Sequence, residues 1–298
     1  MIFDIETYLS ERKELVDRKL LELLPNLNDD SGGLDESMRY SVLGGGKRLR
    51  PILCMAASEA FGGSVESTLP FACAIEMIHT YSLIHDDLPS MDDDLLRRGK
   101  PTNHSIYGEA LAILAGDALL TDAFFLIANE GLTRGLSKSQ LIEVIKDLSV
   151  AAGSRGMVIG QAIDLSLEGC HEVSLDKCER VHLLKTGALI DASIIIGGKI
   201  GGADSYQLSK LKSYSRSVGL AFQIIDDILD IEGDGETGKS RGADARNKKV
   251  TYPALIGTEK SKEIALRLTK EAVDALAGFD VKAKPLRELA FYLGVRRH

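Results

Sequence analysis

The sequence predicts an all-α protein, and three observations support this prediction. Apolar residues recur at helical spacing along most of the chain, alternating strand patterns are rare, and no βαβ rhythm is present. Glycine-rich turns separate the helical segments, with no Pro/Ser-rich linker and no repeat of fixed period. The chain lacks tryptophan, has only 7 prolines and is rich in leucine and alanine, which favours helices. We therefore expect residues 1–298 to form a single domain, a bundle of about 10–13 helices.

The first helix is expected at residues 4–24. Leu9, Val16 and Leu20 repeat at helical spacing, and charged residues fill the opposite face. Pro25 and the glycine pair at 32–33 then end the helix. Further helices are expected at 34–43, 50–61, 66–86, 106–130, 138–153, 155–168, 174–199, 204–231, 251–257, 260–277 and 283–294.

Two segments should lie in the middle of the bundle. Residues 110–128 and 186–200 are apolar on nearly every face, which is typical of helices surrounded by other helices. Gly156 and Gly160 have the spacing that lets two helix backbones approach closely. Simple packing explains this pair best, because a glycine inside a helix otherwise costs about 1 kcal/mol.

The composition excludes several classes of protein. A net charge of −8 argues against a binder of nucleic acid or of anionic membranes. The N-terminus carries charge from residue 4 and is no secretory signal, and the apolar stretch 110–128 is interrupted by Asp117 and Asp122. We expect a soluble cytoplasmic protein with no stable membrane association. The cysteines lie outside any C-x-x-C pair and should be free thiols: Cys54, Cys73, Cys170 and Cys178.

An acidic cluster follows the apolar helix 66–86, in the stretch IHDDLPSMDDDLLRRG at 84–99. On a continuous helix Asp86 and Asp92 would lie about 120° apart. Pro89 stands between them, and the residue before a proline avoids helical geometry. A turn at 88–91 should therefore bring Asp92 back over Asp86.

A second acidic cluster lies in AFQIIDDILD at 221–230. Asp226 and Asp230 are four residues apart and share one helix face, whereas Asp227 points about 100° away. Two carboxylates on one face beside apolar residues would raise each other's pKa unless a cation held them. A solvated acidic loop would explain one such cluster, but not two that each end a long apolar helix.

The two clusters together indicate a magnesium site. Carboxylate oxygens without a supporting Cys or His pair favour Mg²⁺ or Mn²⁺ over zinc. Mg²⁺ typically takes one or two carboxylates and completes its coordination with water and substrate phosphates. Two clusters facing each other would hold several Mg²⁺ ions around one diphosphate.

Basic residues stand next to both clusters. The loop GGKRLRP at 45–51 precedes an apolar helix, and glycines followed by a helix N-terminus favour an anion. Arg97 and Arg98 follow the first cluster, and Lys239 and Lys249 belong to the basic run after the second. Arginine suits bidentate phosphate binding, so these positions next to metal-type clusters predict phosphate recognition.

With these motifs in view, the chain resembles a trans-isoprenyl diphosphate synthase of the bacterial farnesyl diphosphate synthase type. The resemblance runs from about residue 36 to 257 and includes DDLPSMD at 86–92, RRGKPT at 97–102, GQAIDL at 160–165, KTGAL at 185–189 and FQIIDDILD at 222–230. It implies an all-α fold around a central apolar cavity. It also implies a homodimer joined through apolar helices.

The resemblance implies roles for the matching residues. A first set, of carboxylates, would hold three Mg²⁺ ions, for which Mn²⁺ could substitute. A second set would bind the allylic diphosphate and includes the side chains whose dipoles assist catalysis. A third set would bind isopentenyl diphosphate without metal. These sets are, in order, Asp86, Asp87, Asp92, Asp226 and Asp230, with Asp227 in support; Arg97, Lys185, Thr186, Gln223, Lys239 and Lys249; and Lys47, Arg50, His79 and Arg98.

The chemistry implied is ionisation, condensation and elimination. The ions stabilise the allylic diphosphate as a leaving group, and the dipoles of Thr186 and Gln223 steady the allylic cation. The double bond of isopentenyl diphosphate attacks that cation, and the departing diphosphate takes the proton. A dry apolar tunnel keeps water from quenching the cation.

Tyr81 and Ser82 lie five and four residues before Asp86, on nearly the same helix face. They should form the wall or floor of the tunnel below the diphosphate. In the family an aromatic residue here accompanies the farnesyl (C15) product, which we favour over geranylgeranyl (C20) and over C10. The alternative is that Tyr81 only packs the core.

Other functions stay open from the sequence. A non-catalytic synthase-like subunit would be favoured by loss of an aspartate cluster, and neither cluster is lost. A class I terpene cyclase would lack the second diphosphate site, yet Lys47, Arg50 and His79 are present. His85 beside Asp86 resembles the pair of metal phosphohydrolases, but that function leaves the KT motif unexplained.

Overall fold

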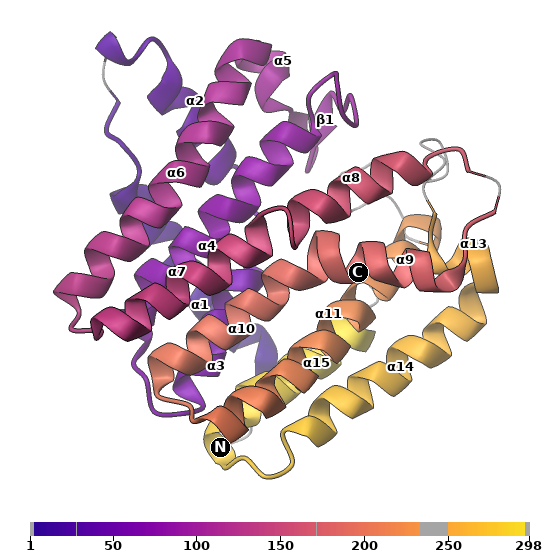
Figure 1. Ribbon diagram of the computed structural model, residues 1–298. Coiled ribbons are helices and arrows are strands. Elements are labelled where there is room, and N and C mark those ends of the chain that lie inside the picture. Colours follow the sequence, from indigo (N-terminus) through magenta and orange to yellow (C-terminus); the bar gives the residue numbers. More distant parts are fainter. Residues whose placement is uncertain (1–2, 28, 171, 233–249, 296–298) are drawn as a thin grey trace. The chain divides into compact units, whose positions relative to one another are not determined.

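The structure is a computed structural model that describes residues 3–27, 29–170, 172–232 and 250–295. Within these ranges the chain is helical apart from one short hairpin, which confirms the predicted all-α class (Figure 1). It divides into two compact units, Met1–Ile52 with Glu66–Ile145 and Leu53–Val65 with Lys146–His298. That the chain forms a single domain stays a prediction.

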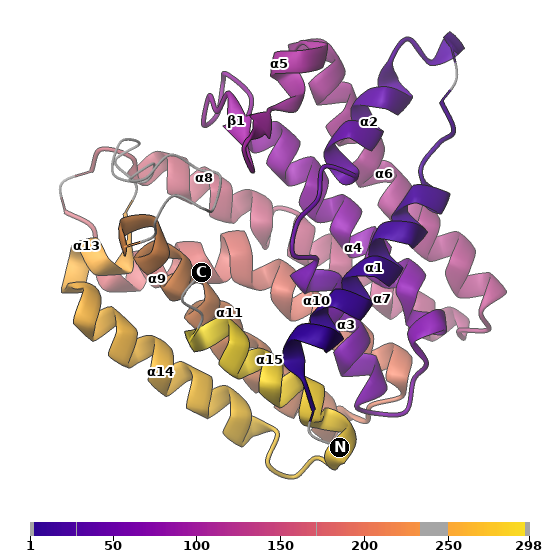
Figure 2. The ribbon, with the colours of Figure 1, turned by 180° about the vertical axis from the view of Figure 1, so that it is seen from behind.

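The first unit holds the N-terminal helices and the hairpin. Its elements are α1 (Ile5–Leu23), η1 (Asp29–Ser31), α2 (Leu34–Val42), the start of α3 (Leu49–Glu59), most of α4 (Val65–Asp86), β1 (Leu96–Arg97), β2 (Lys100–Pro101), α5 (Asn103–Tyr107), α6 (Glu109–Thr133) and the start of α7 (Lys138–Ala152). Helices α2 and α5 pack against α6 and against each other (Figure 2).

The second unit holds the remaining elements: α8 (Met157–Leu167), α9 (Leu175–His182), the π-helical segment η2 (Leu183–Gly187), α10 (Ala188–Gly201), α11 (Ser205–Glu232), α13 (Tyr252–Ile256), α14 (Thr258–Ala275), η3 (Val281–Ala283) and α15 (Lys284–Val295). Helix α11 runs alongside α14 and also packs on α10 and α15 (Figure 1). Its fully buried Tyr214 donates a hydrogen bond to the carbonyl of Leu286 at 2.7 Å, which joins α11 to α15.

Most predicted helices match the observed ones within a few residues, but two were drawn too long. The segment 106–130 begins in α5 and crosses Gly108 into α6, and the segment 174–199 comprises α9, η2 and most of α10. One helix continues through a proline. Pro70 lies inside α4 and has no N–H to give to the carbonyl of Glu66. The guanidinium of Arg134 donates to that carbonyl at 3.0 Å instead. The structure thus replaces the hydrogen bond that the proline removes.

The expectation that residues 110–128 lie in the middle of the bundle is wrong. Helix α6 is apolar, but Ile113, Leu114 and Phe125 are 44%, 52% and 69% exposed. By length and composition α6 and the stretch Leu175–Gly201 are apolar enough to cross a membrane. The apolar window of Leu175–Gly201 is 61% buried, as in a core helix, whereas that of α6 is only 39% buried. An apolar helix face therefore stays uncovered in the single chain.

Candidate functional site

The first acidic cluster begins where α4 ends, at Asp86. The chain turns through residues 87–91, and the amide of Asp92 donates to the carbonyl of Asp86 at 2.9 Å. A second bond, from the amide of Asp93 to the carbonyl of Leu88 at 3.1 Å, closes the same turn. The predicted return of Asp92 to Asp86 across the turn at Pro89 is confirmed.

Asp87 lies on the buried side of this turn and is bound by Arg97. The Arg97 Nε and Nη2 atoms lie 2.6 and 2.5 Å from Asp87 Oδ1, and Nη2 lies 3.6 Å from Asp94. The β1–β2 hairpin, in which Arg97 pairs with Lys100, carries the guanidinium back to the cluster. Burial raises the pKa of Asp87. The hydrogen bond and charge of Arg97 lower this pKa in part, and the negative charges of Asp94 and Asp92 raise it further. The crowded carboxylates are thus only partly neutralised.

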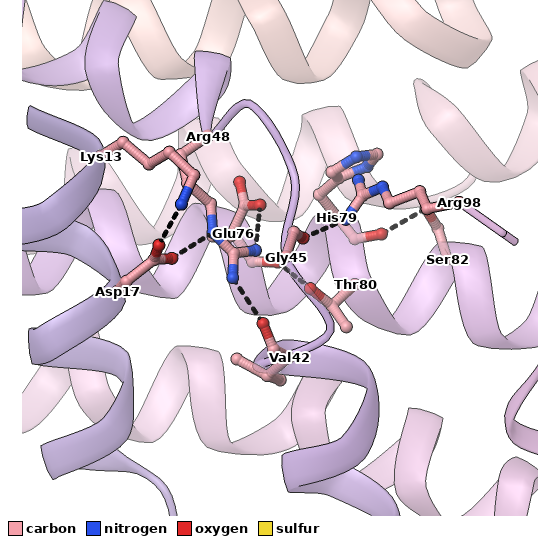
Figure 3. Close-up of polar contacts among 10 residues, drawn as sticks. All are labelled: Lys13, Asp17, Val42, Gly45, Arg48, Glu76, His79, Thr80, Ser82 and Arg98. Carbon is pink, nitrogen blue, oxygen red and sulfur yellow. Dashed lines mark hydrogen bonds and ion pairs between the residues drawn. The ribbon is translucent and has the colours of Figure 1, made fainter. Parts of the chain in front are cut away.

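The basic loop at 45–51 is anchored by Arg48, a residue for which the sequence suggested no role of its own. Its guanidinium binds Asp17 and Glu76 at 2.8 Å each and the carbonyl of Val42 at 2.6 Å (Figure 3). The residue is 3% exposed and has a left-handed φ of 51°. Two carboxylates and a carbonyl therefore hold the loop in one conformation, with Arg48 turned inward.

A cationic cluster surrounds His79. Arg98 donates a hydrogen bond from Nη1 to the carbonyl of Gly45 and lies beside the imidazole of His79 (Figure 3). Burial lowers the pKa of His79 well below its ordinary value, and the positive charges of Arg50 and Arg98 lower it further. A side chain at Gly46 would overlap the Arg98 guanidinium. Three of the four residues predicted to bind isopentenyl diphosphate are thus brought together, and all belong to the first unit.

The fourth predicted residue of that set, Lys47, is exposed on the same loop. Gly45, Gly46 and Arg48 have positive φ values, and the side chain of Arg48 is buried whereas that of Lys47 is exposed. Lys47 lies in the loop ahead of α3 and Arg50 in the first turn of α3, on either side of the inward-facing Arg48 in the sequence.

The predicted chain-length residues lie one turn before Asp86 on α4. Tyr81 is 6% exposed, and its ring meets that of His85 edge-on at 5.8 Å. Burial and the nearby charge of Asp86 raise the pKa of Tyr81 to about 12. Ser82 donates its hydroxyl to the carbonyl of His79 at 2.9 Å. Tyr81 thus lies near the metal-type carboxylate, and its tunnel-floor role stays a prediction.

The histidine beside Asp86 serves packing instead of metal binding. His85 Nε2 lies 3.1 Å from the carbonyl of Ile113, on α6. A side chain at Gly116 would overlap this imidazole. The bond to a carbonyl requires a protonated Nε2, which cannot at the same time ligate a metal. The phosphohydrolase alternative loses its main support.

The second acidic cluster occupies α11, and its carboxylates are divided as predicted. Asp226 is exposed and Asp230 is half-buried one turn later, whereas Asp227 is only 3% exposed. Asp226 and Asp230 therefore share an accessible face of the helix. Asp227 turns into the interior of the second unit.

Asp227 accepts a set of hydrogen bonds there. Its Oδ2 accepts from His182 Nε2 and from the backbone amide of Tyr252, each at 3.0 Å, and its Oδ1 accepts from Gln223 Nε2 at 3.1 Å. Burial lowers the pKa of His182, but the charge of Asp227 and its hydrogen bond outweigh burial and raise it to about 10. Asp227 was predicted to support the metal ligands, but its bond to His182 was not predicted, because no local spacing links residues 182 and 227.

The predicted diphosphate residues Lys185 and Thr186 lie in the π-helical segment η2. π-Helical turns inside longer helices are rare and occur often at functional sites. Lys185 Nζ lies 2.6 Å from Asp164 Oδ2 on α8, and the Thr186 hydroxyl donates to Gln223 Oε1 at 2.8 Å. Thr186 and Gln223, the two side chains predicted to supply catalytic dipoles, are thus hydrogen-bonded to each other. Asp164 belongs to the GQAIDL motif, which was the available signal for its place in the site.

Glycine allows α8 to approach this segment. A side chain at Gly160 would overlap the backbone of Lys185, so the predicted close backbone approach is confirmed there. Gly156 plays a different part, because its added Cβ would meet the carbonyls of Ala151 and Val150 in the turn before α8. Only one of the two glycines therefore serves packing between helices.

The residues available for a metal are all oxygen donors. In the part of the chain that the structure describes, no three His, Cys, Asp or Glu side chains form a preassembled metal site. This donor set suits Mg²⁺, which takes few carboxylates and relies on water and phosphate oxygens, and does not suit zinc. The four cysteines are free, as predicted. Lys239 and Lys249, predicted to bind diphosphate, lie outside the described residues.

The fold and these motifs define a trans-isoprenyl diphosphate synthase, which is a prenyltransferase. Residues 32–278 match the family described as Polyprenyl synthetase. The chain belongs to this family.

Relatives and solved structures agree with that assignment. The chain is 48% identical over 296 residues to "Geranylgeranyl pyrophosphate synthase, chloroplastic" of Catharanthus roseus, covering 99% of this chain and 82% of the relative. It is similar to an FPP/GFPP synthase from Zymomonas mobilis, with 40% identity, a TM-score of 0.88 and coverage of 97% and 98%. A Helicobacter pylori geranyltransferase complexed with magnesium and isoprenyl diphosphate is 33% identical, with a TM-score of 0.84 and coverage of 98% and 97%.

Proposed function

We propose that the protein joins isopentenyl diphosphate head-to-tail to the allylic primers dimethylallyl and geranyl diphosphate. The observation that carries the proposal is the cationic cluster of Arg50, His79 and Arg98, in which the two positive charges act on the buried imidazole. Crowded positive charge around a neutral imidazole is stabilised by an anion. A terpene cyclase has a single diphosphate substrate and needs no such second site.

The allylic diphosphate is proposed to bind through Mg²⁺ at Asp86, Asp92 and Asp226. Asp87 and Asp230 support these ligands, and the ions number three per site, with Mn²⁺ as a substitute. The metal supplies positive charge that stabilises the diphosphate as it leaves. A geranyltransferase of the same fold, crystallised with magnesium and isoprenyl diphosphate, supports the choice of metal.

The remaining steps are assigned to side chains of this chain. Lys185 and Arg97 hold the allylic diphosphate, and Lys239 and Lys249 assist. The allylic C–O bond breaks with its electron pair going to the diphosphate, and the dipoles of Thr186 and Gln223 steady the resulting cation. The double bond of isopentenyl diphosphate then forms the new C–C bond. The released diphosphate takes the proton lost in forming the product double bond.

An assay of the purified protein tests this function. Isopentenyl diphosphate is incubated with each allylic primer and Mg²⁺, and the products are identified by mass. We expect prenyl diphosphates longer than the primer by whole five-carbon units, formed only when metal is present. Cyclic hydrocarbons would indicate a cyclase, free phosphate a phosphohydrolase, and no turnover a non-catalytic subunit, and each result would refute the proposal.

We further propose a farnesyl (C15) product, limited by Tyr81. The supporting observation is that this bulky ring is buried one turn before Asp86. A geranylgeranyl (C20) product is the second candidate, because the Catharanthus roseus relative is named as a geranylgeranyl synthase. The apolar cavity that would hold either tail stays part of the proposal.

Replacing Tyr81 tests the chain-length proposal. Tyr81→Ala should shift the main product from C15 to C20 or longer, because the growing tail gains the space of the ring. Tyr81→Phe keeps the ring, serves as the matched control and should leave the length unchanged. Products are compared by liquid chromatography and mass spectrometry. An unchanged product from Tyr81→Ala would show that Tyr81 only packs the core.

The assembly is proposed to be a homodimer in the cytoplasm, without stable membrane association. Support comes from α6, whose apolar window is only 39% buried in one chain. A second copy of the same helix has the apolar chemistry to cover it, because closed two-fold dimers pair identical surfaces. The exposed side chains on α6 include Ile113, Leu114 and Phe125.

A further inference from the structure

His182 is buried and has a charged hydrogen-bond partner. Neither the sequence motifs nor the proposed reaction gives this residue a role. It is the last residue of α9, and its side chain is 8% exposed. Its ring stacks on that of Tyr252, with centroids 5.6 Å apart and planes 19° apart. A polar ring placed this deeply needs a partner that repays the loss of hydration.

That partner is Asp227, at 3.0 Å from His182 Nε2 to Oδ2. A carboxylate can only accept, so Nε2 carries the proton and donates. The same nitrogen also lies 3.6 Å from the Cys178 sulfur. A nucleophilic Cys–His–Asp triad needs the two partners on opposite ring nitrogens. This geometry therefore excludes a triad and indicates a holding contact.

The bond to His182 continues toward the site. Asp227 Oδ1 accepts from Gln223 Nε2 at 3.1 Å, and Gln223 Oε1 accepts from Thr186 Oγ1 at 2.8 Å. Because the amide nitrogen of Gln223 faces a carboxylate, its oxygen must face Thr186. The orientation of both dipoles thus depends on where Asp227 is held.

The same bonds fasten the π-helical segment at both ends. His182 immediately precedes η2 and binds α11 through Asp227, and Thr186 near the end of η2 binds α11 through Gln223. Lys185 lies between the two attachments. π-Helical turns are rare inside longer helices. Here the two attachments to α11 lie just before the segment and near its end.

We propose that His182 is a positioning residue that holds Asp227 and thereby fixes Gln223, Thr186 and the π-helical segment for catalysis. This role rests on the proposed function, since the aligned groups are those assigned to the allylic cation and its diphosphate. His182 itself touches no substrate.

Two substitutions separate the hydrogen bond from simple filling of space. His182→Leu removes the donor and keeps much of the volume, whereas His182→Gln keeps an N–H donor at similar reach. Tyr214→Phe is the control, because it removes a buried hydrogen bond from the same helix α11 at a distance along the chain from the network. Each purified variant is assayed for kcat and for KM of both substrates, and for its folded fraction by circular dichroism.

We expect His182→Leu to lower kcat about 10- to 100-fold, the loss typical when an outer hydrogen-bond partner of a metal ligand is removed. The KM for isopentenyl diphosphate should stay unchanged, and His182→Gln should recover most of kcat. Tyr214→Phe should leave kcat unchanged per folded molecule. The proposal would be overturned if kcat fell equally in the His182→Leu and His182→Gln variants. It would also be overturned if the fall in kcat matched the fall in the folded fraction.

Hydrogen exchange of the backbone amides gives a readout that needs no turnover. His182→Leu should speed exchange in residues 183–187, and Tyr214→Phe should not. An inactive wild-type protein with this exchange pattern would refute the proposed reaction and retain the positioning role. Unchanged exchange in the Leu variant would refute the positioning role even if the wild-type protein is active.

Discussion

Arg48 and Arg50 stand two positions apart on one basic loop, yet their surroundings give them different tasks. Arg48 has two carboxylate partners at 2.8 Å and is nearly inaccessible, so its charge is balanced within the protein. Arg50 contributes more than Arg48 to the positive potential that lowers the pKa of His79. Buried ion pairs resist loss of either partner, whereas clustered like charges favour a bound anion. Arg48 therefore has a structural role, and the proposed binding role belongs to Arg50.

Diphosphate binding should be visible in the protonation of His79. In the free protein its pKa lies well below the ordinary value, through burial and then Arg50 and Arg98, so the ring is neutral at pH 7. A diphosphate beside it adds negative charge, which favours the protonated ring and raises the pKa. NMR titration with ¹³C-labelled histidine, with and without isopentenyl diphosphate, measures the change. His79→Asn assigns the signal, and a pKa unaffected by saturating ligand would contradict the assigned binding site.

The positions of residues could be predicted where neighbouring residues in the sequence restrict the backbone. Pro89 excludes a helix, and that alone implied the return of Asp92 to Asp86, which the structure confirms at 2.9 Å. Spacing on α11 likewise separated Asp227 from its neighbours. It could not supply the bonds from Arg97 to Asp87 or from His182 to Asp227, because such partners depend on tertiary packing.

At the scale of elements, the helices were predictable and their irregularities were not. Apolar periodicity and glycine turns bound each long helix, but the residues of η2 read as ordinary helix from sequence. The π-helical segment packs against α8 and α11, and such tertiary contacts leave no local sequence pattern. The hairpin at 96–101 was missed for a similar reason, since two-residue strands have no detectable alternation.

The contact between α8 and η2 makes Gly160 a sensitive position. Gly160→Ala should lower the free energy of unfolding by about 1–3 kcal/mol, because the added Cβ overlaps the Lys185 backbone. The higher helix propensity of alanine offsets up to about 1 kcal/mol of this loss. It should also lower kcat, because Lys185 and Thr186 shift with that backbone. Urea unfolding and steady-state kinetics measure both effects. Gly278→Ala is the control, since its Cβ would meet nothing within 4 Å; equal behaviour of the two variants would argue against the close contact.

At the scale of the whole molecule, the prediction from sequence was wrong for α6, a strongly apolar helix. Hydropathy alone predicted that residues 110–128 lie inside the bundle, because it cannot tell a core from an interface. In the structure Phe125 is 69% exposed on α6. Large exposed apolar patches mark sites where a protein or a membrane binds. The exposed face of α6 is therefore the surface on which the proposed dimer is tested.

Substituting Phe125 tests whether that assembly is a dimer. Burying a phenylalanine side chain contributes about 1.5–3 kcal/mol, so Phe125→Glu, which changes both copies of a two-fold interface, should weaken dimerisation by at least about 100-fold. Sedimentation velocity should show the wild-type protein at twice the mass of one chain and the variant at the mass of one. Phe291→Glu, on a 45% exposed side chain of α15, is the matched control and should stay dimeric. A wild-type protein that sediments as one chain, or one that pellets with lipid vesicles through Phe125, would show that a membrane or another partner covers α6 instead of a second copy.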